Sequence, residues 1–287
     1  MPEASVAVIG GSGFYAMEGL AAVEEVRLST PFGEPSDVIT IGTLAGRRVA
    51  FLARHGAGHR LLPAEVPARA NIYALKSLGV ERIIAVSAVG SLREEIAPLH
   101  FAVPDQLLDR TCGRPGTFFG GGLVAHVAFA DPFCPVLSDV LYRAGLEAGA
   151  TVHRGGAYVV IEGPAFSSRA ESHLYRAWGA SLVGMTALPE ARLAREAEIC
   201  YALLACVTDY DSWHPQHEAV TAEMIIANLA RNVEMAQRVV ALAVGGLPSQ
   251  RSCACAMALK DALVTPARRV PKGIREALAP IIGRYMN

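Results

Sequence analysis

Short apolar runs alternate with amphipathic segments along most of the chain. Strands are predicted over residues 6–9, 38–41, 48–53, 82–86, 157–161 and 201–207, and several of these runs are apolar throughout. Helical spacing of apolar side chains predicts helices over residues 63–78, 135–148, 189–198 and 222–243. Continuous apolar strands are typical of sheets that are covered on both faces. The pattern therefore predicts an α/β fold with a central sheet flanked by helices.

The regular alternation ends at Gly245 and Gly246. Residues 247–255 have a loop-like composition, and residues 270–285 predict one more short helix. We therefore expect a main domain over residues 1–245 and a C-terminal extension over residues 246–287 that contains a Cys-x-Cys motif.

Charge and composition narrow the choice of partners. Hydrophobic residues make up 52% of the 287 positions, charged residues make up 18%, and the formal net charge is −1. Such a chain has no basic field to hold nucleic acid or an anionic membrane. It also has no apolar stretch of about 18 residues and no positive flank before its first apolar run. We expect neither a membrane span nor a signal peptide, and we expect a cytoplasmic protein.

Six cysteines are present, at positions 112, 134, 200, 206, 253 and 255. The first four lie in apolar or loop contexts without the spacing of metal ligands, which indicates reduced thiols. Cys253 and Cys255 are separated by one residue. That spacing is too short for an ordinary zinc half-site and could close only a small, strained disulfide ring. Free thiols are therefore the favoured interpretation, and no metal site is expected.

Polar clusters follow the predicted strands at or near their carboxyl ends. They are the glycine-rich turn at 10–13, Arg54-His55, Ser87-Ala88, Met185-Thr186, and Asp209 with Asp211. Ligands bind at this edge of an open α/β sheet. The first four clusters combine backbone N–H groups, a guanidinium, an imidazole and short hydroxyls, which together predict a phosphate site. Each hydroxyl taken singly more often forms a local turn bond.

The acid pair Asp209 and Asp211 ends the apolar run over residues 201–207. Side chains two residues apart on an extended backbone point to the same side, so both carboxyls can hold one polar ring edge. A carboxylate accepts a hydrogen bond from a 6-amino group but repels a 6-oxo oxygen, so an adenine-type base is favoured. The alternative is that the two acids only cap or turn the chain after a buried strand.

Several motifs carry a resemblance to a known family. They are IGGSG at 9–13, TPFG at 30–33, ARHG at 53–56, GSLREE at 90–95, IEGP at 161–164, FSSRAES at 166–172 and DYD at 209–211. With these motifs, which span about residues 5–245, the chain resembles the methylthioadenosine phosphorylase branch of the trimeric purine nucleoside phosphorylases. The resemblance implies a single domain with a mixed central β-sheet flanked by helices, the nucleoside phosphorylase fold.

The resemblance also implies roles for the matching residues. It places phosphate at Ser12, Arg54, His55, Ser87, Ala88 and Thr186. It places the nucleoside at Met185, Phe166, Ser167, Asp209, Asp211, Ala222, Ile225 and Ile226, with His126 supplied by a neighbouring subunit. Asp209 and Asp211 are then the catalytic residues, at the purine N7 and the 6-amino group. As a proton donor, Asp209 needs a pKa well above its ordinary value.

The reaction implied by the resemblance is phosphorolysis of S-methyl-5'-thioadenosine to adenine and 5-methylthioribose 1-phosphate, with adenosine as a candidate second substrate. Inorganic phosphate is a co-substrate, and neither a metal nor an organic cofactor is expected. A site completed by another subunit implies a homotrimer or a dimer of trimers. In longer microbial relatives, cysteines in the tail can form a stabilising disulfide.

Two other functional readings stay open. Within the same fold, a methylthioinosine or general purine nucleoside phosphorylase is the alternative, and the acid pair argues against it. From a different class, a dinucleotide-binding dehydrogenase or a non-catalytic nucleotide-binding sensor could also have a glycine-rich turn at the end of its first strand. The missing third glycine and the additional Arg54-His55 cluster count against the dehydrogenase.

Overall fold

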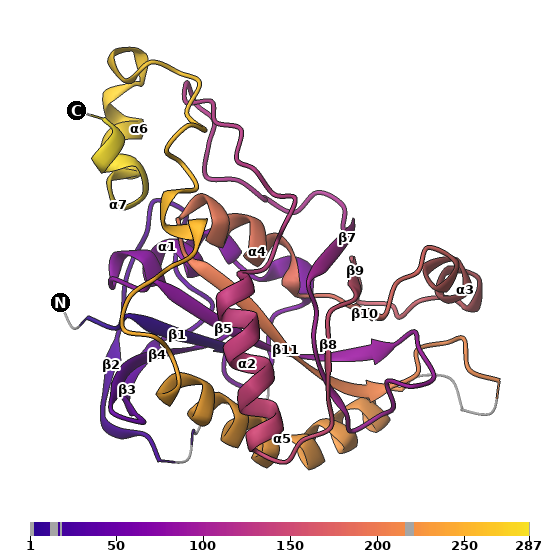
Figure 1. Cartoon of the computed structure of the whole chain (residues 1–287). Coiled ribbons are helices and arrows are strands. Elements are labelled where there is room, and N and C mark those ends of the chain that lie inside the picture. The colour runs from indigo at the N-terminus through magenta and orange to yellow at the C-terminus, as the bar shows by residue number, and fades with distance from the viewer. Residues whose placement is uncertain (1–2, 12–16, 18, 216–220, 287) are drawn as a thin grey trace.

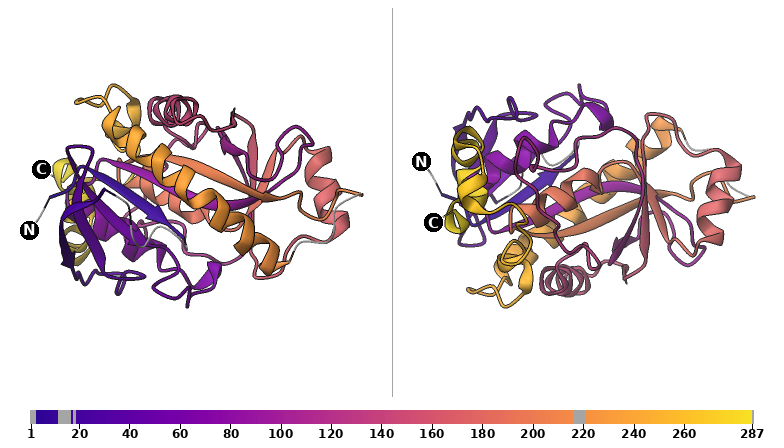
Figure 2. Two further views of the ribbon diagram at one scale, coloured as in Figure 1. Left: turned by 90° about the horizontal axis from the view of Figure 1, so that it is seen from below. Right: turned by 90° about the horizontal axis from the view of Figure 1, so that it is seen from above.

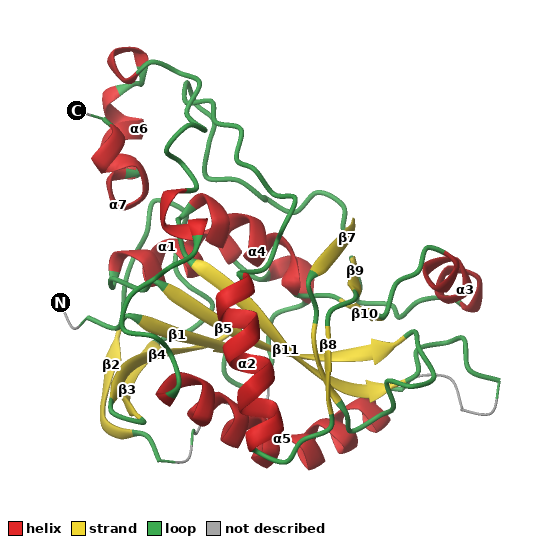
Figure 3. Ribbon diagram, viewed as in Figure 1, coloured by secondary structure: helices red, strands yellow, loops and turns green. Residues whose placement is uncertain are grey.

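The protein is built around one mixed β-sheet with helices on both faces (Figures 1 and 3). The computed structural model describes residues 3–11, 17, 19–215 and 221–286. Eleven strands in these ranges form the sheet. The predicted mixed α/β sheet flanked by helices is therefore confirmed. None of the described helices is long and apolar enough to cross a membrane.

Four long strands form the centre of the sheet: β1 (Val6–Gly10), β4 (Arg47–Ala53), β5 (Arg82–Ser91) and β11 (Cys200–Asp209). β1 runs parallel to both β4 and β5, and β11 runs parallel to β5 along the side opposite β1. Their carboxyl ends consequently meet at one edge, as the sequence pattern requires for a shared site. The remaining strands are β2 (Ala21–Val26), β3 (Ile39–Leu44), β6 (Phe101–Val103), β7 (Gln106–Arg110), β8 (Val152–Arg154), β9 (Ala157–Ile161) and β10 (Leu182–Gly184).

The helices cover the two faces of the sheet and give it two cores. One face packs against α1 (Ala68–Ser77) and α4 (Ala187–Glu196), and the other against α2 (Pro135–Glu147) and α5 (Ala222–Gly245). In the view from below, α5 lies diagonally across the sheet (Figure 2). Along β1, Ile9 belongs to the first core and Val8 to the second, because successive strand side chains point to opposite faces.

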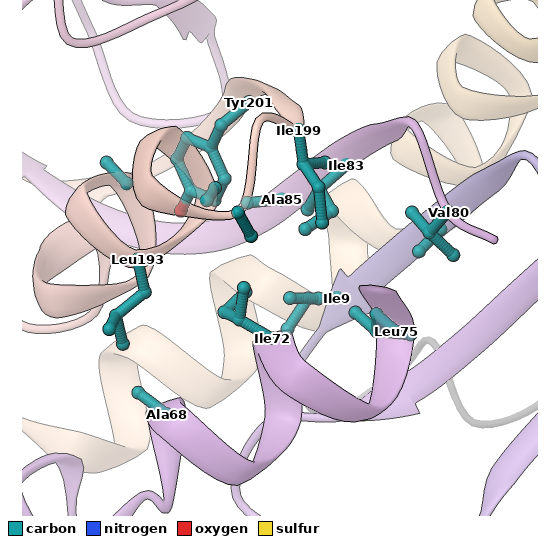
Figure 4. Close-up of a cluster of buried hydrophobic side chains, with 14 of the residues drawn as sticks. Ile9, Ala68, Ile72, Leu75, Val80, Ile83, Ala85, Leu193, Ile199 and Tyr201 are labelled. Atoms are coloured by element: carbon teal, nitrogen blue, oxygen red, sulfur yellow. The ribbon is translucent and has the colours of Figure 1, made fainter. Parts of the chain in front are cut away.

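The first core joins residues that are distant in the sequence (Figure 4). Ile9 of β1, Ile72 of α1, Ile83 of β5 and Leu193 of α4 are all completely buried there. Such a core removes water from the strand ends next to it. At about 25 cal/mol for each square ångström of apolar surface buried, it also supplies most of the free energy that favours folding.

Most elements predicted from the apolar pattern are present, with shifted ends. α1 begins at Ala68 rather than at residue 63, because Pro63 and Pro67 confine the preceding residues to a single 3₁₀ turn and its exit. β5 and β11 continue past their apolar runs to Ser91 and Asp209. The sequence pattern missed five strands, β2, β6, β7, β8 and β10. It also missed α3 (Arg169–Ala177), whose first turn is closed by a capping box.

The C-terminal segment forms two short helices, α6 (Lys272–Ala277) and α7 (Ala279–Ile282), instead of the single helix expected. Ile281 and Ile282 are buried in the same core as α1. The Tyr73 hydroxyl of α1 donates a hydrogen bond of 2.7 Å to the Ala277 carbonyl. In Figure 1 this segment lies next to α1, on the side of the molecule where the N-terminus lies.

A buried ion pair locks the carboxyl edge of the sheet. Arg54, directly after β4, donates from Nε to Glu190 Oε1 at 2.6 Å and from Nη2 to Glu190 Oε2 at 3.1 Å. Both side chains are only 2% exposed. Arg54 also donates to the carbonyls of Ile9 in β1 and Val86 in β5, and the Tyr201 hydroxyl of β11 donates to Glu190. The pair therefore connects four strands to α4.

Replacing Glu190 tests the importance of this pair. We expect Glu190→Gln to lower the free energy of unfolding by about 3 to 5 kcal/mol, because it leaves the Arg54 charge buried without a counter-charge. Urea unfolding of the two proteins measures the difference. The matched control is Glu276→Gln, in an exposed pair with Lys272 at 3.7 Å, for which we expect less than about 1 kcal/mol. Equal effects of the two substitutions would contradict the assignment.

Candidate active site

A cavity of about 800 Å³ opens at the carboxyl edge of the sheet. It brings together most of the site residues expected from the sequence, from the ends of β4, β5, β10 and β11 and the first half of α5. Those that line it are Arg54, His55, Ser87, Ala88, Phe166, Met185, Thr186, Asp209, Asp211, Ala222, Ile225 and Ile226. Gly11 also lines it, whereas Ser12 lies outside the described residues. The volume is that of a site for a small molecule.

One end of the cavity is lined by two hydroxyl groups, a guanidinium and an imidazole. Ser87 in β5 and Thr186 before α4 lie with their hydroxyl oxygens 2.6 Å apart. Arg114 holds this region in place, since its guanidinium donates to the carbonyls of Met185 at 2.6 Å and Leu188 at 3.0 Å. Two hydroxyls so close together can turn their protons toward one shared anion, which suits an oxyanion ligand.

Arg54 cannot offer all the N–H donors of its guanidinium to a ligand. A guanidinium has five N–H donors. Two of them serve Glu190, one serves Val86 and one serves Ile9. Counted over the described residues, one N–H on Nη1 remains for a ligand. Arg54 therefore offers its charge and a single donor, and the geometry of that donor is fixed by the fold.

His55 presents a hydrogen-bond acceptor to the cavity rather than a donor. Its Nδ1 lies 2.9 Å from the Leu61 carbonyl, so Nδ1 carries the proton and donates it there. Burial and then the nearby Arg54 charge lower the pKa of His55 to about 4. At neutral pH the ring is uncharged, and its Nε2 is an acceptor. The His59 ring, which also lines the cavity, stacks on His55 with 4.3 Å between ring centroids.

The acid end of the cavity begins at a bulge in β11. The register against β5 shifts between Val207 and Asp209, and Asp209 lies opposite Gly90. A Cβ at Gly90 would lie 2.8 Å from Asp209 Oδ1, so only glycine leaves room for this carboxyl. The Asn228 side chain of α5 donates 2.7 Å to the Thr208 carbonyl and fixes the bulge from the other side.

The expected extended geometry of the acid pair is wrong, although both acids reach the cavity. β11 ends at Asp209, and Asp211 has a left-handed backbone with φ of 49°. The Asp211 backbone N–H donates to Asp209 Oδ1 at 2.8 Å, and the Thr208 hydroxyl donates to Oδ2 at 2.7 Å. The two carboxyls are therefore brought together by a tight turn rather than by strand alternation.

Burial makes both acids hard to ionise. Burial raises the pKa of Asp209 to about 6, although the bonds from Thr208 and Asp211 lower it. Burial also raises the pKa of Asp211, against the opposing effect of the nearby Ser172 and Ser167 hydroxyls. Asp211 Oδ2 has no well-formed hydrogen bond within the part of the chain that the structure describes. One carboxyl can therefore carry a proton near neutral pH, and the other has an acceptor to offer.

The opposite walls of the cavity are apolar. Ala222, Ile225 and Ile226 face it from the start of α5, which is capped by the Thr221 side chain. Phe166 lies at the mouth and is 40% exposed. These surfaces suit an uncharged, apolar part of a ligand.

Two expected residues lie beyond the cavity lining. Ser167 is buried close to Asp211, and its carbonyl accepts a hydrogen bond from the Ser212 hydroxyl. His126 lies in the exposed loop between β7 and α2, where its backbone N–H donates 2.9 Å to Ala262. It does not line the cavity of its own chain.

Sequence reasoning missed several residues that shape the site. They are Glu190, Arg114, Asn228 and His59. Glu190 stands in the first turn of α4, where an acid is common at a helix start and carries no sign of burial. Arg114 and Asn228 act on backbone carbonyls, which no sequence pattern reveals. His59 follows His55 by four residues, and that proximity was the only available signal.

The raised pKa of Asp209 predicts a pH-dependent stability. A carboxyl whose pKa rises on folding destabilises the fold above its unfolded pKa of 3.8, and the cost is complete above about pH 6. We expect Asp209→Asn to be more stable than the parent at pH 7 by up to about 3 kcal/mol, with the difference about halved at pH 5. Urea unfolding at both pH values measures this. A difference that does not change with pH would contradict it, and Asp139→Asn on the surface of α2 is the control.

Comparisons with known proteins agree on one family. A family model described as "Phosphorylase superfamily" matches residues 5–244. S-methyl-5'-thioadenosine phosphorylase of Chloroflexus aurantiacus is 60% identical over the full length of both chains. The enzyme of the same name from Geobacter sulfurreducens is 56% identical over 99% of this chain and 100% of its own.

Solved structures give the same result. A methylthioadenosine phosphorylase from an antarctic soil metagenomic library has a TM-score of 0.94 and 51% identity, over 98% of this chain and 99% of its own. A mutant adenosine/methylthioadenosine phosphorylase from Schistosoma mansoni in complex with methylthioadenosine has a TM-score of 0.82 and 32% identity, over 98% of each chain. The chain therefore belongs to the phosphorylase superfamily, in the family of the S-methyl-5'-thioadenosine phosphorylases.

Proposed function

We propose that the protein catalyses phosphorolysis of S-methyl-5'-thioadenosine to adenine and 5-methylthioribose 1-phosphate, a step of purine and methionine salvage. The observation that carries this proposal is the polarity of the cavity. Hydroxyls and a buried arginine lie at one end, carboxyls with raised pKa values at another, and apolar walls between them. The full-length identity to enzymes of this name supports the same substrate.

Inorganic phosphate is the co-substrate, and it binds at the end formed by Ser87, Thr186 and Arg54. The two hydroxyls and the remaining Arg54 N–H donate to its oxygens, and the arginine charge favours the dianion. His55, neutral and with a proton on Nδ1, accepts a hydrogen bond from a protonated phosphate oxygen at Nε2. The backbone at Ala88 and Gly11 completes this end, and Ser12, which the family resemblance assigns to phosphate, lies outside the described residues.

Asp209 and Asp211 bind the base. Asp209, whose pKa burial raises to about 6, is protonated in the substrate complex and donates that proton to the purine N7 as the bond to C1′ breaks. The carboxyl of Asp211, which lines the cavity, accepts a hydrogen bond from the 6-amino group, for which a 6-oxo base has no equivalent donor. Ser167 supports Asp211 from behind.

The two ends act on one transition state. As the glycosidic bond stretches, C1′ gains positive charge and the base gains negative charge. Phosphate on one side stabilises the positive charge on C1′, and the Asp209 proton stabilises the negative charge on the base. Both effects are strengthened when the bound substrate displaces water from the reacting bond. The ribose lies against Met185, and the residues of this chain supply these groups without a metal or organic cofactor taking part.

The 5′ substituent lies against Ala222, Ile225 and Ile226, with the base beside Phe166. An apolar wall favours a thioether over a hydroxyl, but one such difference is worth only about 1 to 3 kcal/mol. Adenosine is therefore a slower second substrate.

We propose a homotrimer, or a pair of trimers, in which a neighbouring subunit covers the mouth of the cavity. Ile226 is 67% exposed there and Phe166 40%, which leaves apolar surface for a partner to bury. The exposed loop that carries His126 is the segment we expect to reach across. Sedimentation equilibrium should give a trimeric or hexameric mass, and a fully active monomer would contradict the proposal.

We further propose that residues 1–245 form the catalytic domain and residues 246–287 a supporting extension, because every described residue that lines the cavity comes from the first segment. A cytoplasmic location is also proposed. None of the six cysteines forms a disulfide, which suits a reducing compartment.

Base release from three nucleosides tests the function. Methylthioadenosine, adenosine and inosine are each incubated with the enzyme, with and without inorganic phosphate. We expect adenine release that requires phosphate and is fastest from methylthioadenosine. Preferred cleavage of inosine would support the alternative, a methylthioinosine or general purine nucleoside phosphorylase. Saturable binding without any base release would favour a nucleotide-binding sensor.

The role of Asp209 has its own kinetic test. We expect Asp209→Asn to lower kcat for methylthioadenosine by about 10² to 10⁴, because an amide cannot deliver a proton to N7. The loss should be smaller for a nucleoside whose base leaves without protonation. The control Asp139→Asn should keep the parent rate. An Asp209→Asn enzyme with kcat within about threefold of the parent would rule out the donor role.

A further inference from the structure

Four cysteines that are scattered along the sequence converge far from the active site. Cys134 precedes the first turn of α2, Cys200 begins β11, and Cys253 and Cys255 come from the C-terminal segment. Their four sulfur atoms lie within 4.8 Å of one another, and all but Cys253 are buried. Asp209 is at the other end of β11, about 30 Å away at about 3.3 Å per residue. The cluster has no part in the chemistry described above.

We propose that Cys134, Cys200, Cys253 and Cys255 form a structural zinc site that fastens the C-terminal extension to the catalytic domain. Zinc in such sites is bound tetrahedrally by four thiolates at about 2.3 Å, which places the sulfur atoms about 3.8 Å apart. The Sγ atoms of Cys200 and Cys253 are 3.3 Å apart, and no pair in the cluster exceeds 4.8 Å. Shifts of about 1 Å or less therefore bring all four onto one ion.

The surroundings favour negative charge at this point. Four thiolates around Zn²⁺ leave a net charge of −2. Arg82 and Arg251 line the small cavity that borders Cys134, Cys200 and Cys253. Arg82 is fixed by donation to the Pro248 carbonyl at 3.1 Å. Glu81 pairs with both arginines, so one positive charge is left over.

The position of Cys134 adds to this effect. It is the N-cap residue of α2, a helix of 13 residues, and the N-terminal end of a helix dipole stabilises a thiolate. The spacing of Cys253 and Cys255 argued against a zinc half-site in the sequence. In an ordinary zinc site each half supplies a pair of ligands that are close in sequence. Here Cys134 and Cys200, the other two ligands, come from separate elements. Four soft thiolates in tetrahedral array select zinc over the harder Mg²⁺ and Ca²⁺.

The site has a structural purpose. Between the end of α5 and the start of α6, the chain has only 3₁₀ turns among its described elements. A metal bound to α2, β11 and the first part of this segment would cross-link it to the domain where regular hydrogen bonding is sparse. The competing product of the same thiols is one or two disulfides, which would make the same connection by oxidation.

The test begins with the full-length protein, purified under reducing conditions without chelator. We expect about one zinc ion per chain by elemental analysis. After removal of zinc, added Co²⁺ should produce the strong visible absorption of a tetrathiolate site. Thiol reagents should then modify Cys112 rapidly, while the four cluster thiols react only after the metal is removed.

Two variants separate the proposal from its alternatives. The double variant Cys253→Ser and Cys255→Ser should lose at least about nine tenths of the zinc, while the exposed control Cys112→Ser should keep it. The cobalt spectrum of the parent protein decides the matter even where the double variant does not fold. Zinc-free protein with disulfides in this cluster, or fully reduced protein that gives no cobalt absorption, would overturn the proposal.

Discussion

One buried ion pair sets the geometry on which the cavity depends. Arg54 and Glu190 carry their charges where neither can be hydrated, so each is tolerated only while the other is present. Arg54 also binds the carbonyls of Ile9 and Val86, and this fixes the ends of three parallel strands relative to α4. The cationic end of the site is therefore formed by folding itself, and a bound anion meets a charge that does not have to move.

The same low-dielectric surroundings act in opposite directions at the two ends of the cavity. At one end, burial is offset by Glu190, and Arg54 stays charged. At the other end, burial is only partly offset by hydrogen bonds, and the pKa of Asp209 rises to about 6. An anionic nucleophile and a proton donor can thus face one ligand from two ends of the same cavity. The charge pattern is complementary to a transition state in which the sugar becomes positive and the base negative.

The sequence allowed the sheet and the edge of the site to be predicted, because both follow from short-range patterns. Continuous apolar runs mark β1, β5 and β11, and polar clusters mark their carboxyl ends. What escaped prediction depends on contacts across the chain: the Arg54–Glu190 pair, which joins residues 136 positions apart, and the four-cysteine cluster. The turn at Asp211 escaped for another reason. Positive φ is uncommon for any non-glycine residue, aspartate included, so an extended backbone was the natural but wrong expectation.

Catalysis by this site requires Asp209 to carry the proton that the leaving base needs. Its protonation can be followed by carbon-13 NMR of aspartate-labelled enzyme, saturated with phosphate and an unreactive methylthioadenosine analogue, with Asp209→Asn used to assign the signal. We expect a carboxyl signal that remains that of the protonated acid at pH 7 and titrates above the value of about 6 for the unliganded protein. An Asp209 that is ionised in the complex at pH 7 would contradict it and leave this residue only a hydrogen-bond acceptor.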